Sequence, residues 1–154
     1  MHSPMIAIWW VGGLSWLFWR QFHPRPVARR PRISLVLIAL GAVETVLYLS
    51  DQSLPGTALL VLTGSFAVGL ALSAARSRTV RLWPEDGTVW RRGTATTMVL
   101  WIVALAVHFA SGRLVVDTGG PAGTSSATVL LYLGVALLTQ TLLVRQRAAH
   151  LTAR

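Results

Sequence analysis

The feature that most constrains this chain is a series of apolar stretches, each long enough to cross a lipid bilayer as a helix. Crossing about 30 Å of hydrocarbon takes about 20 helical residues. Separate segments of this kind must be helical in lipid, because an open strand leaves its backbone polar groups without partners. Five segments meet the requirement, and they cover approximately residues 4–20, 33–50, 56–75, 94–110 and 127–144.

The composition agrees with an integral membrane protein. Apolar residues make up 53% of the 154 residues and charged residues only 12%, with a mean hydropathy of +0.58. A soluble domain needs roughly a quarter of its residues charged to cover an apolar interior. We therefore predict a single all-α transmembrane domain over residues 1–154, with the lipid bilayer as its main environment.

The arginines predict the orientation of the spans. All fourteen basic residues are arginine, and all but Arg113 fall within residues 20–32, within residues 76–92, or after residue 144. Short loops rich in arginine stay in the cytoplasm, so five spans place the N-terminus outside and the C-terminus inside. Membrane topology and anionic lipid headgroups account for the net charge of +9, and we do not expect nucleic-acid binding.

Two of the loops carry structural signals of their own. Residues 79–92 contain two short runs rich in Val, Thr and Trp on either side of Pro-Glu-Asp-Gly, which predicts a small cytoplasmic β-hairpin. Its Trp83 and Trp90 suit the membrane interface, where an indole can bury its rings and keep its N–H hydrated. Residues 118–126 are rich in Gly, Ser and Thr, and we expect a mobile outer loop with nothing to pack against.

The missing residue types exclude several chemistries. Without cysteine the chain has no disulfide, no thiolate metal site and no dithiol exchange. Without lysine it has neither a phosphate-loop lysine nor Schiff-base chemistry. Nucleophile elbows, paired catalytic carboxylates and clustered metal-ligand spacings are also missing. The sequence thus predicts no catalytic residue, no metal site and no cofactor, and it favours a protein that is not an enzyme.

Glu44 is the one acid inside a predicted span. It shares a helical face with Tyr48 and Asp51, and His108 lies at a similar depth on the fourth span. One hypothesis is a polar lining, open to the outside, in which these four residues bind a ligand or a proton. The other is a structural carboxyl group that holds helices together. Either hypothesis predicts a hydrogen bond from Glu44 to the third or fourth span, with His108 and Thr63 as candidates.

Small residues recur every four positions on the third span, at Ser65, Gly69 and Ser73. This spacing lets helices approach closely. We interpret the stripe as packing within the bundle, with a homodimer face as the alternative. Thr139, Gln140 and Thr141 form an uncharged polar group on the fifth span, and we expect it to bond to a neighbouring helix.

Several short motifs resemble the CcdC-like family of small bacterial membrane proteins. The similarity covers roughly residues 25–113, and the family is associated by name with cytochrome c biogenesis. The motifs are residues 64–69 (GSFAVG), 78–80 (RTV) and 86–93 (DGTVWRRG), followed by Trp101. The resemblance implies a polytopic bundle in the bacterial cytoplasmic (inner) membrane and an accessory role. It supplies no catalytic residue.

Two functions therefore follow from the sequence. The first is a membrane accessory protein that acts through contacts with lipid or with a membrane protein partner, linked to cytochrome c biogenesis by the resemblance. The alternative is an intramembrane binder or enzyme for an apolar small molecule, with Glu44, Tyr48 and His108 around a pocket in the outer leaflet. A structure distinguishes them, because the alternative requires the three side chains to converge.

Overall fold

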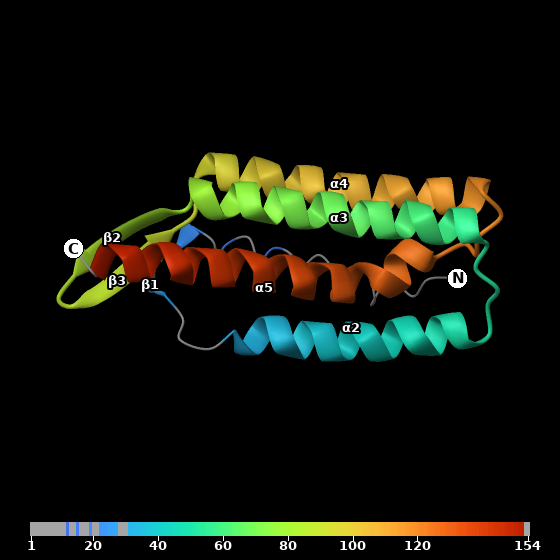
Figure 1. Cartoon of the computed structure of the whole chain (residues 1–154), viewed down its shortest axis with the longest axis horizontal. Helices are drawn as coiled ribbons and strands as arrows, with labels where there is room; N and C mark the ends of the chain where they lie inside the picture. Colours follow the sequence, from blue (N-terminus) through green and yellow to red (C-terminus); the bar gives the residue numbers. More distant parts are fainter. Residues whose placement is uncertain (1–11, 13–14, 16–18, 20–21, 28–30, 153–154) are drawn as a thin grey trace.

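Four long helices and a small sheet make up the part of the chain that the computed structural model describes, namely residues 12, 15, 19, 22–27 and 31–152. The helices run along the longest axis of the molecule and the sheet lies at one end of them (Figure 1). The helices are α2 (Arg32–Ser50), α3 (Gly56–Thr79), α4 (Ala95–Asp117) and α5 (Thr124–Thr152), and the strands are β1 (Arg25–Pro26), β2 (Arg81–Glu85) and β3 (Thr88–Arg92).

All four helices are long and apolar enough to cross a membrane. They correspond to the second to fifth predicted spans, so the mostly helical character of the fold is confirmed. The first predicted span, residues 4–20, lies almost wholly outside the described residues. The count of five spans and the outside position of the N-terminus therefore stay predictions.

Three of the helices extend further than their predicted spans. The predicted spans end at residues 75, 110 and 144, but α3 continues to Thr79, α4 to Asp117 and α5 to Thr152. Arginine is a good helix former, so a charge can mark the edge of the hydrocarbon without ending the helix. With 29 residues, α5 is about 43 Å long, and at the sheet end it extends past α3 and α4 (Figure 1).

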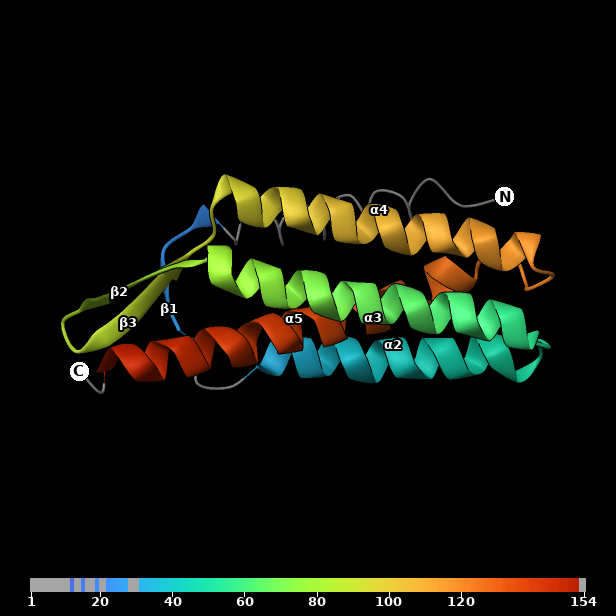
Figure 2. The same ribbon diagram turned by 45° about the horizontal axis from the view of Figure 1, so that its top comes forward.

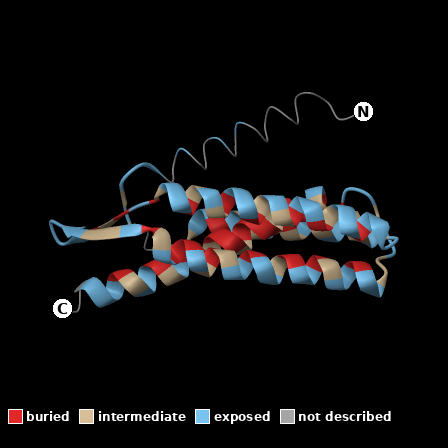
Figure 3. Ribbon diagram, turned by 90° about the horizontal axis from the view of Figure 1, so that it is seen from above, coloured by how far each residue is buried: buried red, intermediate tan, exposed pale blue. Residues whose placement is uncertain are grey.

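The centre of the bundle is α5. It contacts α2, α3 and α4, while α3 and α4 also pack against each other; Figure 1 shows α2 on one side of α5 and the α3–α4 pair on the other. Buried residues follow the faces where the helices meet (Figure 3). Trp101 of α4 forms the main apolar cluster with four residues of α5, namely Val129, Leu133, Ala136 and Leu137.

Glycines allow α2 and α5 to approach closely. A Cβ atom on Gly41 of α2 would overlap the backbone of Leu131, and a Cβ on Gly134 of α5 would lie 2.7 Å from the backbone nitrogen of Ile38. Real Cβ contacts are longer than this, so any side chain at either position would push the two backbones apart.

The sheet confirms the predicted hairpin. Strands β2 and β3 pair antiparallel, with Trp83 opposite Trp90, and Figure 2 shows this hairpin projecting from the bundle beside the C-terminal end of α5. Asp86 and Gly87 form the turn with φ values of 48° and 71°, as a two-residue hairpin turn requires. Strand β1 pairs with the other edge of β3; Pro26 is tolerated there because β1 is an edge strand.

Threonines and an arginine attach the sheet to the helices. The hydroxyl of Thr79, at the end of α3, lies 2.8 Å from that of Thr97 in the first turn of α4. Thr94 caps α4 in a capping box with Thr97 and also donates to the backbone oxygen of Thr79. Arg147 of α5 donates to the backbone oxygens of Ser77 and Val80. These bonds hold the start and the end of the hairpin on the bundle.

The prediction that residues 118–126 have nothing to pack against is wrong. The phenol of Tyr48 donates to the backbone oxygen of Ala122, and Thr124 is buried. Gly119 and Gly123 have φ values of 84° and 96°, a conformation that glycine adopts readily. These glycines turn the chain tightly from α4 into α5, so the segment lies against α2 instead of projecting from the bundle.

Replacing Gly41 with alanine tests the close packing of α2 on α5. We expect Gly41→Ala to lower the free energy of unfolding by about 1–3 kcal/mol, because the added methyl group meets backbone atoms. Gly64→Ala is the matched control, since a Cβ there meets no atom within 4 Å and alanine stabilises a helix by about 0.5–1 kcal/mol. Equal effects of the two substitutions on unfolding in mixed micelles would mean that α2 does not pack here.

Candidate functional site

Polar side chains in the last two turns of α2 make two contacts with α5 and the segment before it. Thr45 donates to the backbone oxygen of Gly41 at 2.6 Å and lies 3.3 Å from that of Ala127. Tyr48 is half-buried and bonds to the segment before α5. Asp51 is exposed and caps the C-terminal end of α2. Thr45 and Tyr48 therefore fasten α2 to the beginning of α5, and Tyr48 is the member of the predicted polar face that takes part.

Glu44 does not make the predicted hydrogen bond. Thr63 donates to the backbone oxygen of Leu59 in its own helix, and His108 bonds to residues of α3 and α5. Within the described part of the chain, the Glu44 carboxyl group has no hydrogen bond or ion pair. The physical reason is the position of α2, which packs on α5 and not on the α3–α4 pair.

His108 is the centre of a buried polar cluster between α3, α4 and α5. Its exposed fraction is 0%. Its Nδ1 lies 3.1 Å from the hydroxyl of Ser65, and its Nε2 lies 3.1 Å from the backbone oxygen of Ser125. Because a carbonyl only accepts, Nε2 carries the proton; in the neutral ring Nδ1 then accepts from Ser65.

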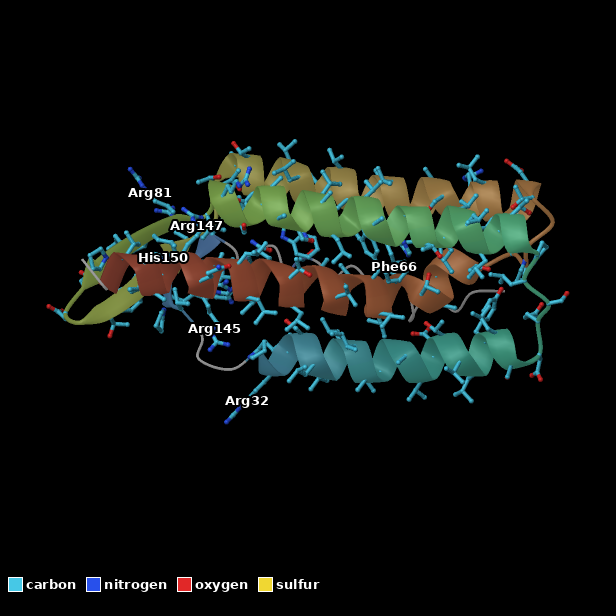
Figure 4. The ribbon with its side chains drawn as sticks, viewed as in Figure 1. Arg32, Phe66, Arg81, Arg145, Arg147 and His150 are labelled. Atoms are coloured by element: carbon cyan, nitrogen blue, oxygen red, sulfur yellow. The ribbon has the colours of Figure 1, made fainter. Side chains whose placement is uncertain are left out.

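Aromatic rings complete this cluster. The ring of Tyr132 is stacked on His108 with centroids 4.2 Å apart, and Phe66 meets the imidazole edge-on at 6.0 Å. Phe66 lies between α3 and α5 (Figure 4). The Tyr132 hydroxyl donates to the backbone oxygen of Ala104 at 2.9 Å. Both ring nitrogens of His108 are thus engaged within the bundle, and the ring faces are covered, which suits a structural role.

The four predicted site residues are therefore divided between two places. His108 lies in the interior of the three-helix group, whereas Glu44 and Tyr48 belong to α2 and Asp51 caps its C-terminal end. Tyr48 bonds to Ala122, just before α5, and His108 bonds to Ser125, in the first turn of α5. They come from different helices, and the Glu44 carboxyl group is bonded to neither.

The small residues of α3 line its contacts with α4 and α5. Ser65 bonds to His108, and a Cβ on Gly69 would overlap the ring of Tyr132. Ser73 is buried and donates to the backbone oxygen of Gly69 at 2.7 Å. The stripe is thus occupied by packing within this chain.

A second polar cluster lies further along the same stripe, and sequence reasoning missed it. Arg76 has an exposed fraction of 0%. One of its terminal nitrogens donates to Ser73 at 2.6 Å, and its guanidinium carbon lies 3.8 Å from the ring centroid of Trp101. The charge of Arg76 predicts a position in the loop after the third span. Its position three residues after Ser73, on the same helical face, was the signal for burial.

Positive charge is concentrated at the sheet end of the molecule. Figure 4 shows Arg32, Arg81, Arg145 and Arg147 there, from three different elements. Asp51 and Asp117 lie at the opposite ends of their helices. This is the distribution that short arginine-rich loops on one membrane side produce. Among the described residues, no group of three or more His, Asp or Glu side chains could hold a metal ion.

Comparison of the chain with protein-family models, with curated proteins and with solved structures finds no match.

A double-mutant cycle on His108 and Ser65 tests the buried cluster. We expect His108→Leu and Ser65→Ala each to lower the free energy of unfolding. The double mutant should lose about 0.6–1.7 kcal/mol less than the sum of the two single losses, because either substitution alone already removes the shared hydrogen bond. Thr63→Ala is the control partner, since its hydroxyl donates within its own helix. If the losses from His108→Leu and Ser65→Ala add to within about 0.3 kcal/mol in the double mutant, the hydrogen bond between the two side chains is contradicted.

Proposed function

We propose that the protein is a non-enzymatic accessory protein of the bacterial cytoplasmic membrane, and that it binds a membrane protein partner through α2. The observation that carries the proposal is the carboxyl group of Glu44, which lies on an apolar helix with no partner in the described part of the chain. A charged side chain at the centre of a bilayer costs about 2.5–3.5 kcal/mol, so such a group usually has a partner.

The surroundings of Glu44 support a partner outside the chain. Leu40 and Leu47, one turn before and one turn after Glu44, are 56% and 67% exposed. Glu44 itself is half-buried at the edge of the α2–α5 contact. A second membrane helix placed against the two leucines would reach the carboxyl group, and a basic or hydrogen-bonding side chain on it would satisfy Glu44.

The alternative function, a pocket formed by Glu44, Tyr48 and His108, has less support. The hydrogen bonds of His108 and Tyr48 are directed at backbone and side-chain groups of this chain. A ligand would have to displace them, whereas a helix against Glu44 would displace only lipid. The link to cytochrome c biogenesis stays part of the proposal and rests on the resemblance of the motifs.

Site-specific photo-cross-linking in cells tests the interface. With a photoreactive phenylalanine analogue at Leu40, we expect a protein adduct of one defined mass whose yield falls about tenfold or more on Glu44→Leu, a loss of the size of one charge-assisted hydrogen bond. Glu44→Gln keeps a hydrogen-bonding group and should retain part of the adduct. The same analogue at Ile102 of α4, which is 59% exposed, is the control and should react with lipid.

Two results would contradict the interface. One is that positions 40 and 102 give the same lipid adducts, which would make both of them ordinary lipid-facing positions. The other is that the protein adduct at position 40 is unaffected by Glu44→Leu, since the partner would then not recognise the carboxyl group.

A further inference from the structure

The cluster around Arg76 contains buried N–H groups without acceptors. Arg76, Trp101 and Gln140 are each at most 1% exposed. Within the described residues, the Nε and Nη1 atoms of Arg76, the indole nitrogen of Trp101 and both amide atoms of Gln140 have no hydrogen-bond partner. Buried polar atoms are almost always paired in folded proteins, and an unpaired group indicates a missing water, ion or ligand.

Contacts between the helices place these side chains at neighbouring levels of the bundle. The Arg76 guanidinium is stacked on Trp101, and Trp101 packs in a cluster with Leu137 of α5. Gln140 follows Leu137 by one helical turn, about 4.5 Å along the axis. Arg147, two turns further on the face of Gln140, donates to the backbone oxygen of Ser77, the residue after Arg76. Gln140 is therefore placed between the levels of Trp101 and Ser77.

The unpaired groups are mainly donors, and one of them, the guanidinium of Arg76, carries a positive charge. Arg76 has one unpaired N–H on Nε and two on Nη1, the Trp101 indole has one, and the Gln140 amide has two. Among these groups the one unpaired acceptor is the amide oxygen of Gln140. All five acids of the chain lie among the described residues, and none of them pairs with Arg76. Water alone would supply as many donors as acceptors. An anion with several acceptor oxygens would pair with these donors and offset the buried charge.

We propose that Arg76, Trp101 and Gln140 form a binding site for a phosphate group, either free or in the headgroup of an anionic phospholipid. Free phosphate offers three or more strong acceptor oxygens, and a phospholipid phosphodiester offers two together with its two ester oxygens, whereas a carboxylate offers two in all. Either form of phosphate therefore suits the larger number of donors. Arg76 is three residues from the end of α3, and the phosphates of a bilayer lie near the ends of the helices that span it. The site does not depend on the partner proposed for Glu44.

Ligand-dependent stability tests the site in two experiments. In the first, delipidated protein in dodecyl maltoside is titrated with inorganic phosphate at constant ionic strength, and the melting temperature is followed. In the second, the protein is placed in nanodiscs of phosphatidylcholine alone or mixed with phosphatidylglycerol, and retained lipid is identified by native mass spectrometry. A ligand that binds only the folded state raises its stability in a saturable way.

Three variants make the test specific. Arg76→Gln should lower the affinity for phosphate, or the retention of phosphatidylglycerol, about tenfold or more, because a charge-assisted hydrogen bond is lost. Trp101→Phe keeps an aromatic ring but removes the indole N–H, and should weaken binding while the bundle still folds. Arg78→Gln is the matched control: it removes the same charge from an exposed position on the same turn of α3 and should leave binding unchanged.

The outcomes distinguish the sources of the phosphate. Saturable stabilisation by inorganic phosphate, lost in Arg76→Gln and kept in Arg78→Gln, supports a free phosphate. If phosphatidylglycerol gives this pattern of variants and inorganic phosphate gives no response, the ligand is a lipid headgroup. Equal responses of Arg76→Gln and Arg78→Gln would reveal general charge screening and overturn the site. The absence of any response to either source would overturn it as well and would assign the unpaired atoms to water.

Discussion

The arrangement of this bundle depends on the need to pair polar groups inside an apolar environment. Lipid supplies no hydrogen bonds, so a polar side chain in a spanning helix must find its partner in the protein or in a bound molecule. Here α5 meets that need, because it packs on α2 and on the α3–α4 pair. It contributes the Ser125 oxygen to His108 and donates from Arg147 to the end of α3.

The same requirement separates the polar residues by role. The imidazole of His108 is bonded at both nitrogens and covered by Tyr132 and Phe66, so it stabilises the three-helix group. Arg76 has one hydrogen bond and a stacked indole, which offset only part of the cost of burying its charge. Glu44 has no internal partner at all within the described residues. Incomplete pairing, and not catalytic geometry, marks the places where this protein is expected to bind something.

Four helices and the hairpin could be predicted from the sequence, because apolar length and turn residues act locally. Helix ends were less predictable, since Arg145 marks a change of environment and not a helix break. The separation of Glu44 from His108 could not be predicted, because helical periodicity gives the faces of a helix but not the neighbour of each face. Gly41 and Gly134 allow α2 to pack closely against α5. In this arrangement Glu44 lies at the edge of the contact between the two helices. The charge of Arg76 predicts a loop, whereas its position three residues after Ser73, on the face of Ser65 and Gly69, predicts burial. The structure agrees with the position and not with the charge.

The most direct test is to compare the free energy of unfolding of His108→Met and Arg76→Met, each delipidated and in phosphate-free buffer. Methionine removes the polar group at either position and keeps apolar bulk. We predict that His108→Met loses about 1–3 kcal/mol, because it leaves Ser65 unpaired. We predict that Arg76→Met is unchanged or gains up to about 4 kcal/mol, because a buried charge without an anion is removed. An equal loss in both variants would contradict this account, since Arg76 would then be fully paired within the chain.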